Sequence, residues 1–143
     1  MSGFIFRRQF AIEWGHCDPA GIIFNARFFE FFDRSAWLTV EAALDVAPGG
    51  LFAAYGIAGL PPADAEAKFL SPAKFGDLAQ IESQIVESSG ARFKLVHRMS
   101  VDGRAVAEGT ETRVWSARDL AAPYGLRAEA IPDAALARFR RAA

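Results

Sequence analysis

Alternation of hydrophobic and polar residues predicts strands in five parts of the chain. Residues 4–14 mix aromatic and β-branched residues with charges at alternate positions, and period-two alternation returns at 78–88, 91–101 and 104–117. Residues 63–70 also have the character of a strand. Asp102-Gly103 lies between two of these runs, and an Asp-Gly pair in such a place is the strongest short signal for a hairpin. Ser89-Gly90 predicts a second turn, so we expect the later strands to pair antiparallel.

A run without Gly or Pro from 22 to 44 predicts one long helix. A helix over most of that span is about 30 Å long at about 1.5 Å per residue. Asn25 is expected as its N-cap. The run is apolar on nearly all sides, so the helix is expected to be buried. One face at helical spacing holds Phe28, Phe31, Phe32, Ser35, Ala36, Thr39 and Ala43.

The remaining segments are short. Residues 45–62 are rich in Gly and Pro and predict a loop, with one short helix at 51–55. Residues 132–141 open with Pro and end with basic residues, which predicts a short helix. A strand, a long helix and about four antiparallel strands indicate an α+β fold in which one sheet wraps around the helix. The length of 143 residues is that of one domain, which we expect to span residues 1–143.

Composition narrows the class of protein. The chain is 52% hydrophobic with a net charge of −1, which excludes a disordered chain and gives no sign of a nucleic-acid partner. Its one cysteine excludes an intrachain disulfide and a Cys-rich zinc site. No segment approaches the roughly 20 apolar residues of a membrane span, and no signal peptide is recognised. We therefore expect a cytoplasmic protein without a membrane partner.

Asp18 is the residue best placed for chemistry. It lies in GHCDPAGIIF, between the first predicted strand and the start of the long helix. The unpaired amides of a helix start can hold a developing oxyanion, while a nearby carboxylate attacks an acyl group or activates water. The structural alternative is an Asx-turn, because Asp before Pro commonly only stabilises a loop.

Several segments of the chain carry a resemblance. WGHCDPAGIIF followed by NARFFEFFDRS, GIAGLP at 56–61, KFLSPAKFGD at 68–77 and RAEAIPDA at 127–134 together cover most of it. They resemble the 4-hydroxybenzoyl-CoA thioesterase family of the hot-dog fold, in which a Gly-x-Cys-Asp-Pro-Ala-Gly loop precedes a long helix. The resemblance implies hydrolysis of an acyl-CoA without a metal or other cofactor. It also implies a homodimer or homotetramer with the active site between subunits.

The resemblance also implies roles for individual residues. Asp18 corresponds to the catalytic carboxylate, as nucleophile or general base, and the backbone N–H near Asn25 would polarise the thioester carbonyl. Asp33 would face the acyl pocket and accept a hydrogen bond from a ring hydroxyl; the alternative is that Asp33 pairs with a nearby Arg. The other implied substrate contacts are the pocket walls Phe24 and Phe28, the turn residues Gly59 and Leu60, and Arg92 and Lys94 for the CoA phosphates.

The acyl group is less well defined, because the pocket departs from the family pattern. His16 stands where relatives often have an acidic residue, and Arg27 and Phe28 replace an Asn-Tyr pair. The expected substrate is an aromatic acyl-CoA similar to 4-hydroxybenzoyl-CoA. The alternatives are a thioesterase for short aliphatic acyl-CoA or acyl carrier protein, and a non-catalytic acyl-CoA-binding protein on the same fold.

Other reactive side chains are assigned structural roles. Cys17 is interpreted as a small buried hydrophobe, and His97 as a structural or interface residue in mid-strand. Two histidines without a carboxylate cluster do not predict a metal site. Glu30 and Glu41 are expected at solvated or interface positions of the helix, although a second hot-dog lineage uses a helix Glu as its carboxylate.

Overall fold

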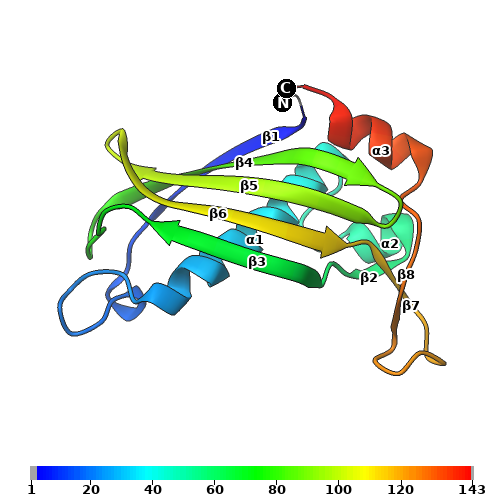
Figure 1. The fold of residues 1–143 in the computed structure, drawn as a ribbon, viewed down its shortest axis with the longest axis horizontal. Helices are drawn as coiled ribbons and strands as arrows, with labels where there is room; N and C mark the ends of the chain where they lie inside the picture. Colours follow the sequence, from blue (N-terminus) through cyan, green and yellow to red (C-terminus); the bar gives the residue numbers. More distant parts are fainter. Residues whose placement is uncertain (1–2, 143) are drawn as a thin grey trace.

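A long helix crosses one face of a five-stranded antiparallel sheet in the computed structural model, which describes residues 3–142 (Figure 1). The helix is α1, Asn25–Ala43. The order of the sheet is β1-β4-β5-β6-β3. These strands are β1 (Ile5–Ala11), β3 (Pro62–Phe69), β4 (Leu78–Ser89), β5 (Arg92–Val101) and β6 (Arg104–Val114). The predicted α+β class, the long helix and the antiparallel pairing are confirmed.

A second, smaller sheet lies at one end of the molecule. It holds β2 (Ile57–Gly59), β7 (Ser116–Arg118) and β8 (Leu126–Ala128) in the order β2-β7-β8. The expectation that one sheet accounts for the whole chain is therefore wrong, because strands of three residues are too short to show a period. The short helices at 51–55 and near the C-terminus are confirmed as α2 (Leu51–Tyr55) and α3 (Asp133–Arg140), and a 3₁₀ turn, η1, covers Trp14–His16.

Helix α1 buries one face, not all of its surface. The seven residues predicted for one face are all buried against the sheet. However, Phe29 is 42% exposed and Trp37 and Leu38 are half-buried. The expectation of a helix buried on nearly all sides is wrong for the single chain, because one sheet covers only one side of a cylinder. The N-cap is Phe24 in extended conformation, and Asn25 is the first helical residue.

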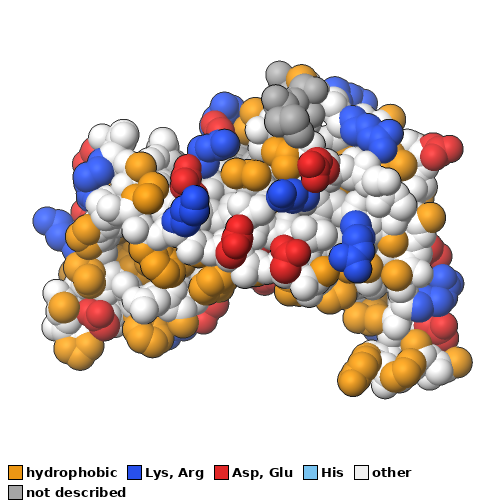
Figure 2. Space-filling model, viewed as in Figure 1, with side chains coloured by type: hydrophobic (Ala, Val, Ile, Leu, Met, Phe, Trp, Pro, Cys, Tyr) orange, Lys and Arg blue, Asp and Glu red, His pale blue; other side chains and the backbone are white. Residues whose placement is uncertain are grey.

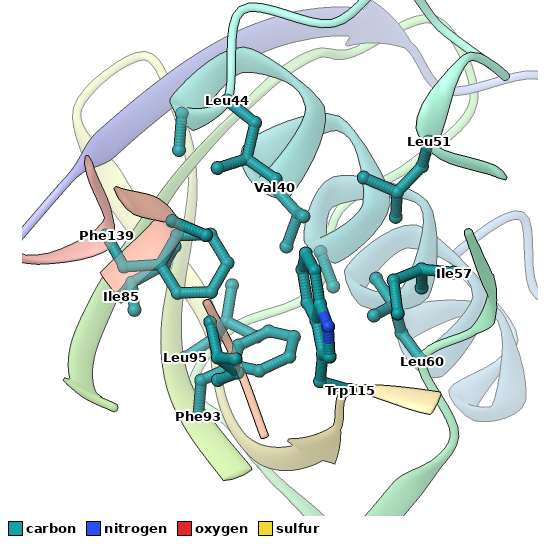
Figure 3. Packing of buried hydrophobic residues seen from close by; sticks show 14 residues of the cluster. Val40, Leu44, Leu51, Ile57, Leu60, Ile85, Phe93, Leu95, Trp115 and Phe139 are labelled. Carbon is teal, nitrogen blue, oxygen red and sulfur yellow. The ribbon is translucent and has the colours of Figure 1, made fainter. Parts of the chain in front are cut away.

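Two hydrophobic clusters hold the layers together. At one end, Trp115 packs edge-on against Phe139 of α3, with ring centroids 6.1 Å apart (Figure 3). It also packs edge-on against Tyr55 of α2, with ring centroids 5.7 Å apart. This cluster fastens both short helices to the sheet. At the other end, Ile23, Phe28, Phe31 and Phe32 belong to a second cluster beneath the loop that precedes α1.

The β5–β6 hairpin has the geometry that its sequence predicts. Asp102 and Gly103 have φ angles of 49° and 77°, and two successive residues in the left-handed region define the type I′ turn.

Strand β3 is one edge of the five-stranded sheet. It pairs only with β6 and is exposed along nearly its whole length. No helix among residues 3–142 is both long and apolar enough to cross a membrane.

Candidate active site

The loop between β1 and α1 is held on the sheet by backbone hydrogen bonds at both of its ends. The Ile12 N–H donates to the Asp77 carbonyl at 2.8 Å, and the Ile23 N–H donates to the Ala73 carbonyl at 2.9 Å. Ile12 and Ile23 are buried, so apolar contacts reinforce the same two points. The loop is therefore a defined platform for the residues that it carries.

Asp18 forms the expected turn and keeps one oxygen available. Its Oδ1 accepts a hydrogen bond from the Ala20 N–H at 2.8 Å, and its carbonyl accepts one from the Gly21 N–H at 2.9 Å. The structural alternative, an Asx-turn, is therefore present. The side chain is only half-buried, and Oδ2 has no hydrogen-bond partner among the described residues. The turn therefore fixes the position of the carboxylate while Oδ2 remains able to accept a hydrogen bond or to react.

The start of α1 offers free donors beside this loop. The Phe24 N–H donates back to the His16 carbonyl at 3.0 Å, and the Arg27 N–H donates to the Phe24 carbonyl at 2.9 Å. Between them, the Asn25 N–H has no partner within residues 3–142. A helix of 19 residues places partial positive charge at this end. The geometry suits an anionic oxygen.

Aromatic side chains surround the same end of the molecule. Phe28 packs against Phe69 of β3 with centroids 5.2 Å apart, and Trp14 meets Phe75 edge-on at 5.7 Å. Phe28 is buried, whereas Phe24 is 50% exposed, and their role as walls of an acyl pocket stays a prediction. Figure 2 shows hydrophobic side chains gathered where Figure 1 places this loop. The large apolar residues exposed here are Trp14, Ile22, Phe24, Phe69, Leu70, Phe75 and Leu78.

Asp33 is connected to the predicted pocket turn through a residue that the sequence analysis did not select. Arg113 Nη2 lies 2.7 Å from Asp33 Oδ1, and Arg113 Nη1 donates to the Leu60 carbonyl at 2.9 Å. Gly59 precedes this turn in β2, where an added Cβ would lie 3.1 Å from Leu126 of β8. Asp33 and the Leu60 carbonyl therefore both contact the side chain of Arg113.

Arg92 and Lys94 lie elsewhere in the single chain. Their neighbours Phe93 and Leu95 face the helix, so both cations lie on the outer face of the sheet, where Figure 2 shows scattered charges. They are at the start of β5, whereas the Asp18 loop lies beside its other end. At about 3.3 Å per residue, Arg92 lies about 30 Å and Lys94 about 23 Å from the end of β5 that is beside the loop. Their assignment to the phosphates stays a prediction.

The other candidate residues have local partners. The Cys17 thiol donates to the Glu13 carbonyl at 3.6 Å and is half-buried. The exposed Glu30 pairs with Arg27 at 3.0 Å. The expectation of a solvated or interface position is wrong for Glu41 within the single chain, since it is buried and its Oε2 accepts a hydrogen bond from the Gly49 N–H at 2.8 Å. Within the described range, no cluster of His, Cys, Asp and Glu is placed to hold a metal ion.

A buried polar network was missed. Glu111 accepts hydrogen bonds from His97 at 2.7 Å and Arg113 at 2.6 Å. Burial alone raises the pKa of Glu111, but these bonds and the charge of Arg113 lower it more, so the net shift is downward. His97 is fully buried, which confirms its structural role. The signal was available, because alternation along 91–101 and 104–117 places all three polar residues in the inward phase.

Arg8 is a half-buried cation near α1. It donates to the Ser35 hydroxyl at 2.7 Å and to the Phe31 carbonyl at 2.9 Å, so it ties β1 to the helix. Desolvation, and then the charge of Arg34, lower the pKa of Arg8 to about 10. It therefore remains a cation at neutral pH.

Comparisons with known proteins give the class. Residues 12–139 match the family model described as thioesterase-like superfamily, and the chain belongs to that family. It is a thioester hydrolase with the hot-dog fold. No curated protein matches the chain by sequence.

Three solved structures show the likeness in detail. The 4-hydroxybenzoyl-CoA thioesterase from Pseudomonas sp. strain CBS-3 is 26% identical, with a TM-score of 0.83 over 94% of this chain and 98% of that one. A mutant 4-hydroxybenzoyl-CoA thioesterase complexed with 4-hydroxybenzoyl-CoA is 25% identical, with a TM-score of 0.84 over 95% and 99%. A gentisyl-coenzyme A thioesterase is 25% identical, with a TM-score of 0.78 over 94% and 99%.

Proposed function

We propose that the chain, as a single hot-dog domain over residues 1–143, hydrolyses a hydroxylated aromatic acyl-CoA to the free acid and CoA. The observation that carries the proposal is the Asp18 loop, in which a carboxylate with one unpaired oxygen precedes a helix start with a free Asn25 N–H. The relatives named for 4-hydroxybenzoyl-CoA and gentisyl-CoA support the acyl class. Neither a metal nor an organic cofactor is required.

The chemistry needs one carboxylate and one oxyanion donor. As nucleophile, Asp18 adds to the thioester carbonyl, the C–S bond breaks to release CoA thiolate, and water then hydrolyses the mixed anhydride. As general base, Asp18 takes a proton from a water molecule whose oxygen adds to the acyl carbon. The C–S bond then breaks to release CoA thiolate, as in the first route. In both routes the carbonyl oxygen becomes anionic, and the Asn25 N–H at the positive end of α1 stabilises it.

Aromatic walls support an aromatic acyl group. Phe24 and Phe28 lie at the start of α1, and flat rings pack against such side chains at about 0.5–1.5 kcal/mol per pair beyond the burial of area. Asp33 accepts a hydrogen bond from a ring hydroxyl in this proposal, and Gly59 and Leu60 form the turn that closes the pocket. An acyl group without the hydroxyl leaves the carboxylate underpaired.

A second copy of the chain completes the site in this proposal. Strand β3 is an exposed edge, and the exposed aromatic residues lie at the end of the molecule that carries the Asp18 loop. Because of the distance along β5, we propose that Arg92 and Lys94 reach a CoA bound at this loop from a partner. We therefore expect a homodimer or homotetramer, and a light-scattering mass of one chain, 15.5 kDa, at micromolar concentration would contradict it.

A panel of acyl-CoA esters with detection of the released thiol tests the proposal. We expect kcat/KM to be highest for 4-hydroxybenzoyl-CoA, lower for benzoyl-CoA and lowest for hexanoyl-CoA. Asp33→Asn should reduce the ratio of kcat/KM for 4-hydroxybenzoyl-CoA to that for benzoyl-CoA. The rate with benzoyl-CoA itself should stay nearly unchanged. A best rate with hexanoyl-CoA contradicts the aromatic class but not thioester hydrolysis.

A further inference from the structure

Arg113 is a buried cation that joins three elements. Its side chain is 3% exposed although it lies near the end of β6. Nη2 lies 2.7 Å from Asp33 Oδ1 of α1 and 2.6 Å from Glu111 Oε1 of its own strand. Nη1 donates to the Leu60 carbonyl at 2.9 Å, between β2 and β3. One guanidinium therefore sets the position of a helix carboxylate relative to a turn.

A second buried layer, formed by Glu111, His97 and Ser83, supports this cation from within the sheet. The other oxygen of Glu111 accepts a hydrogen bond from His97 Nε2 at 2.7 Å, and His97 Nδ1 lies 2.7 Å from Ser83 Oγ. The ring of His97 stacks on Phe32, with centroids 5.0 Å apart and planes 7° apart. Phe32 directly precedes Asp33 in α1. The layer thus contacts the helix next to the carboxylate that Arg113 engages.

Stability alone does not require these charges. Taking opposite charges out of water is costly, and a well-packed apolar cluster of the same volume is often as stable. The best-attested use of such buried groups is to fix one arrangement against alternatives. The arrangement fixed here ends at Asp33, whose side chain is 54% exposed. Its Oδ2 has no hydrogen-bond partner in the described part of the chain.

We infer that Arg113 is a positioning residue for acyl-group selection. It engages Oδ1 of Asp33, so that Oδ2 is presented to a hydroxyl on the acyl group. Through the Leu60 carbonyl it also fixes the distance between this acceptor and the turn. The inference rests on the proposed function, in which Asp33 meets a ring hydroxyl. Arg113 does not touch the substrate, so its effect is on discrimination between substrates.

The test compares substrate discrimination among variants. The measured quantity is the ratio of kcat/KM for 4-hydroxybenzoyl-CoA to that for benzoyl-CoA in the full chain. Asp33→Asn sets the lower limit of the ratio. We expect Arg113→Met and Glu111→Gln to lower the ratio by at least about fivefold, as loss of an oriented charged acceptor implies. Arg113→Lys restores a charge but not the fork, so it should recover only part of the ratio.

Thr39→Val is the matched control. It removes a buried hydrogen bond of α1, from the Thr39 hydroxyl to the Ser35 carbonyl at 2.6 Å, without touching the network. The ratio should stay at the wild-type value even if the variant is less stable. If a general loosening of the helix lowers discrimination, the ratio will fall in Thr39→Val as well. A lowered ratio in this control would overturn the inference. If Arg113→Met does not fold, the ratios measured for Arg113→Lys and Glu111→Gln decide whether the inference stands.

The outcomes separate the two proposals. A wild-type ratio near one means that Asp33 does not read a hydroxyl, and both the acyl class and the role of Arg113 are then wrong. A high wild-type ratio that Asp33→Asn abolishes, but that Arg113→Met and Glu111→Gln retain, leaves the acyl class standing and overturns the positioning role. A fall in the network variants, with Thr39→Val unchanged, supports both.

Discussion

At the scale of single residues, Asp18 shows how one side chain can be a turn former and a reactive group together. The Ala20 N–H occupies one oxygen and leaves the other free. An amide side chain can keep the turn, because its oxygen still accepts the same hydrogen bond, but it is neither a nucleophile nor a base. Replacement by Asn therefore separates the two roles.

Asp18→Asn should lower kcat by at least about 100-fold while the fold is retained, which is typical of a lost acid–base or nucleophilic group. Asp119→Asn is a matched control, because Asp119 Oδ1 accepts a hydrogen bond from the Ala121 N–H at 3.0 Å in the same kind of turn. Steady-state kinetics and circular dichroism on both variants check this. Normal turnover in folded Asp18→Asn would remove Asp18 from the mechanism.

Arg92→Ala and Lys94→Ala should raise KM for the CoA ester with little change in kcat. Phosphate contacts remote from the carbonyl contribute equally to ground-state and transition-state binding. Arg98→Ala is the control on the outward face of the same strand, where Arg98 lies 3.8 Å from Glu82. An unchanged KM in both Arg92 and Lys94 variants would place the phosphates elsewhere.

At the scale of elements, the contact between α1 and β6 depends on a missing side chain. A Cβ added at Gly109 would lie 2.6 Å from the Phe32 ring, and Phe32 in turn stacks on His97. The helix lies close to the strand only because Gly109 leaves this space. The close approach brings Asp33 within reach of Arg113.

Gly109→Ala should therefore destabilise the protein by about 1–3 kcal/mol, the usual cost of overpacking a dense core. Gly15→Ala is the control, since an added Cβ at Gly15 meets nothing within 4 Å. Denaturant unfolding of both variants measures the difference. Equal stability of the two would mean that α1 moves away without cost.

Local patterns predicted the elements, and the misses have physical causes. The Asp102-Gly103 turn and the α1 core face follow from residues close in sequence, so they were predictable. The strands around Ile57 and Leu126 are too short to show a period. The prediction of Asn25 as N-cap is wrong by one residue, since Phe24 keeps extended backbone angles and its N–H donates to the loop at His16.

At the scale of the whole molecule, the candidate site was predicted in part. The Asp18 loop is contiguous in sequence, so its local geometry followed from its motif. The network is not contiguous, because Ser83, His97 and Glu111 come from three strands and meet only through the sheet register. Sequence alone does not show which inward polar residues become partners.

Acid should weaken the fold through Glu111. Its pKa is lowered in the folded state below the ordinary value of 4.5, so it stabilises the fold above about pH 4.5, and this contribution is lost as the pH falls through the folded-state pKa. The free energy of unfolding should decrease less steeply with acid in Glu111→Gln than in wild type. Glu108→Gln, at an exposed position of the same strand, is the control for the loss of one carboxylate. Urea titrations from pH 7 to pH 3 measure all three.

The exposed β3 edge has a consequence for how the protein behaves while it is being made. An unpaired edge strand is a template for further strands, and newly made chains at high concentration can add to it in the wrong register. The sequence of β3 limits this hazard, because Pro62 has no N–H to donate and Asp64, Glu66 and Lys68 place charges along the edge. Neutralisation of the charges at these positions would lower solubility during expression before it altered any rate of hydrolysis.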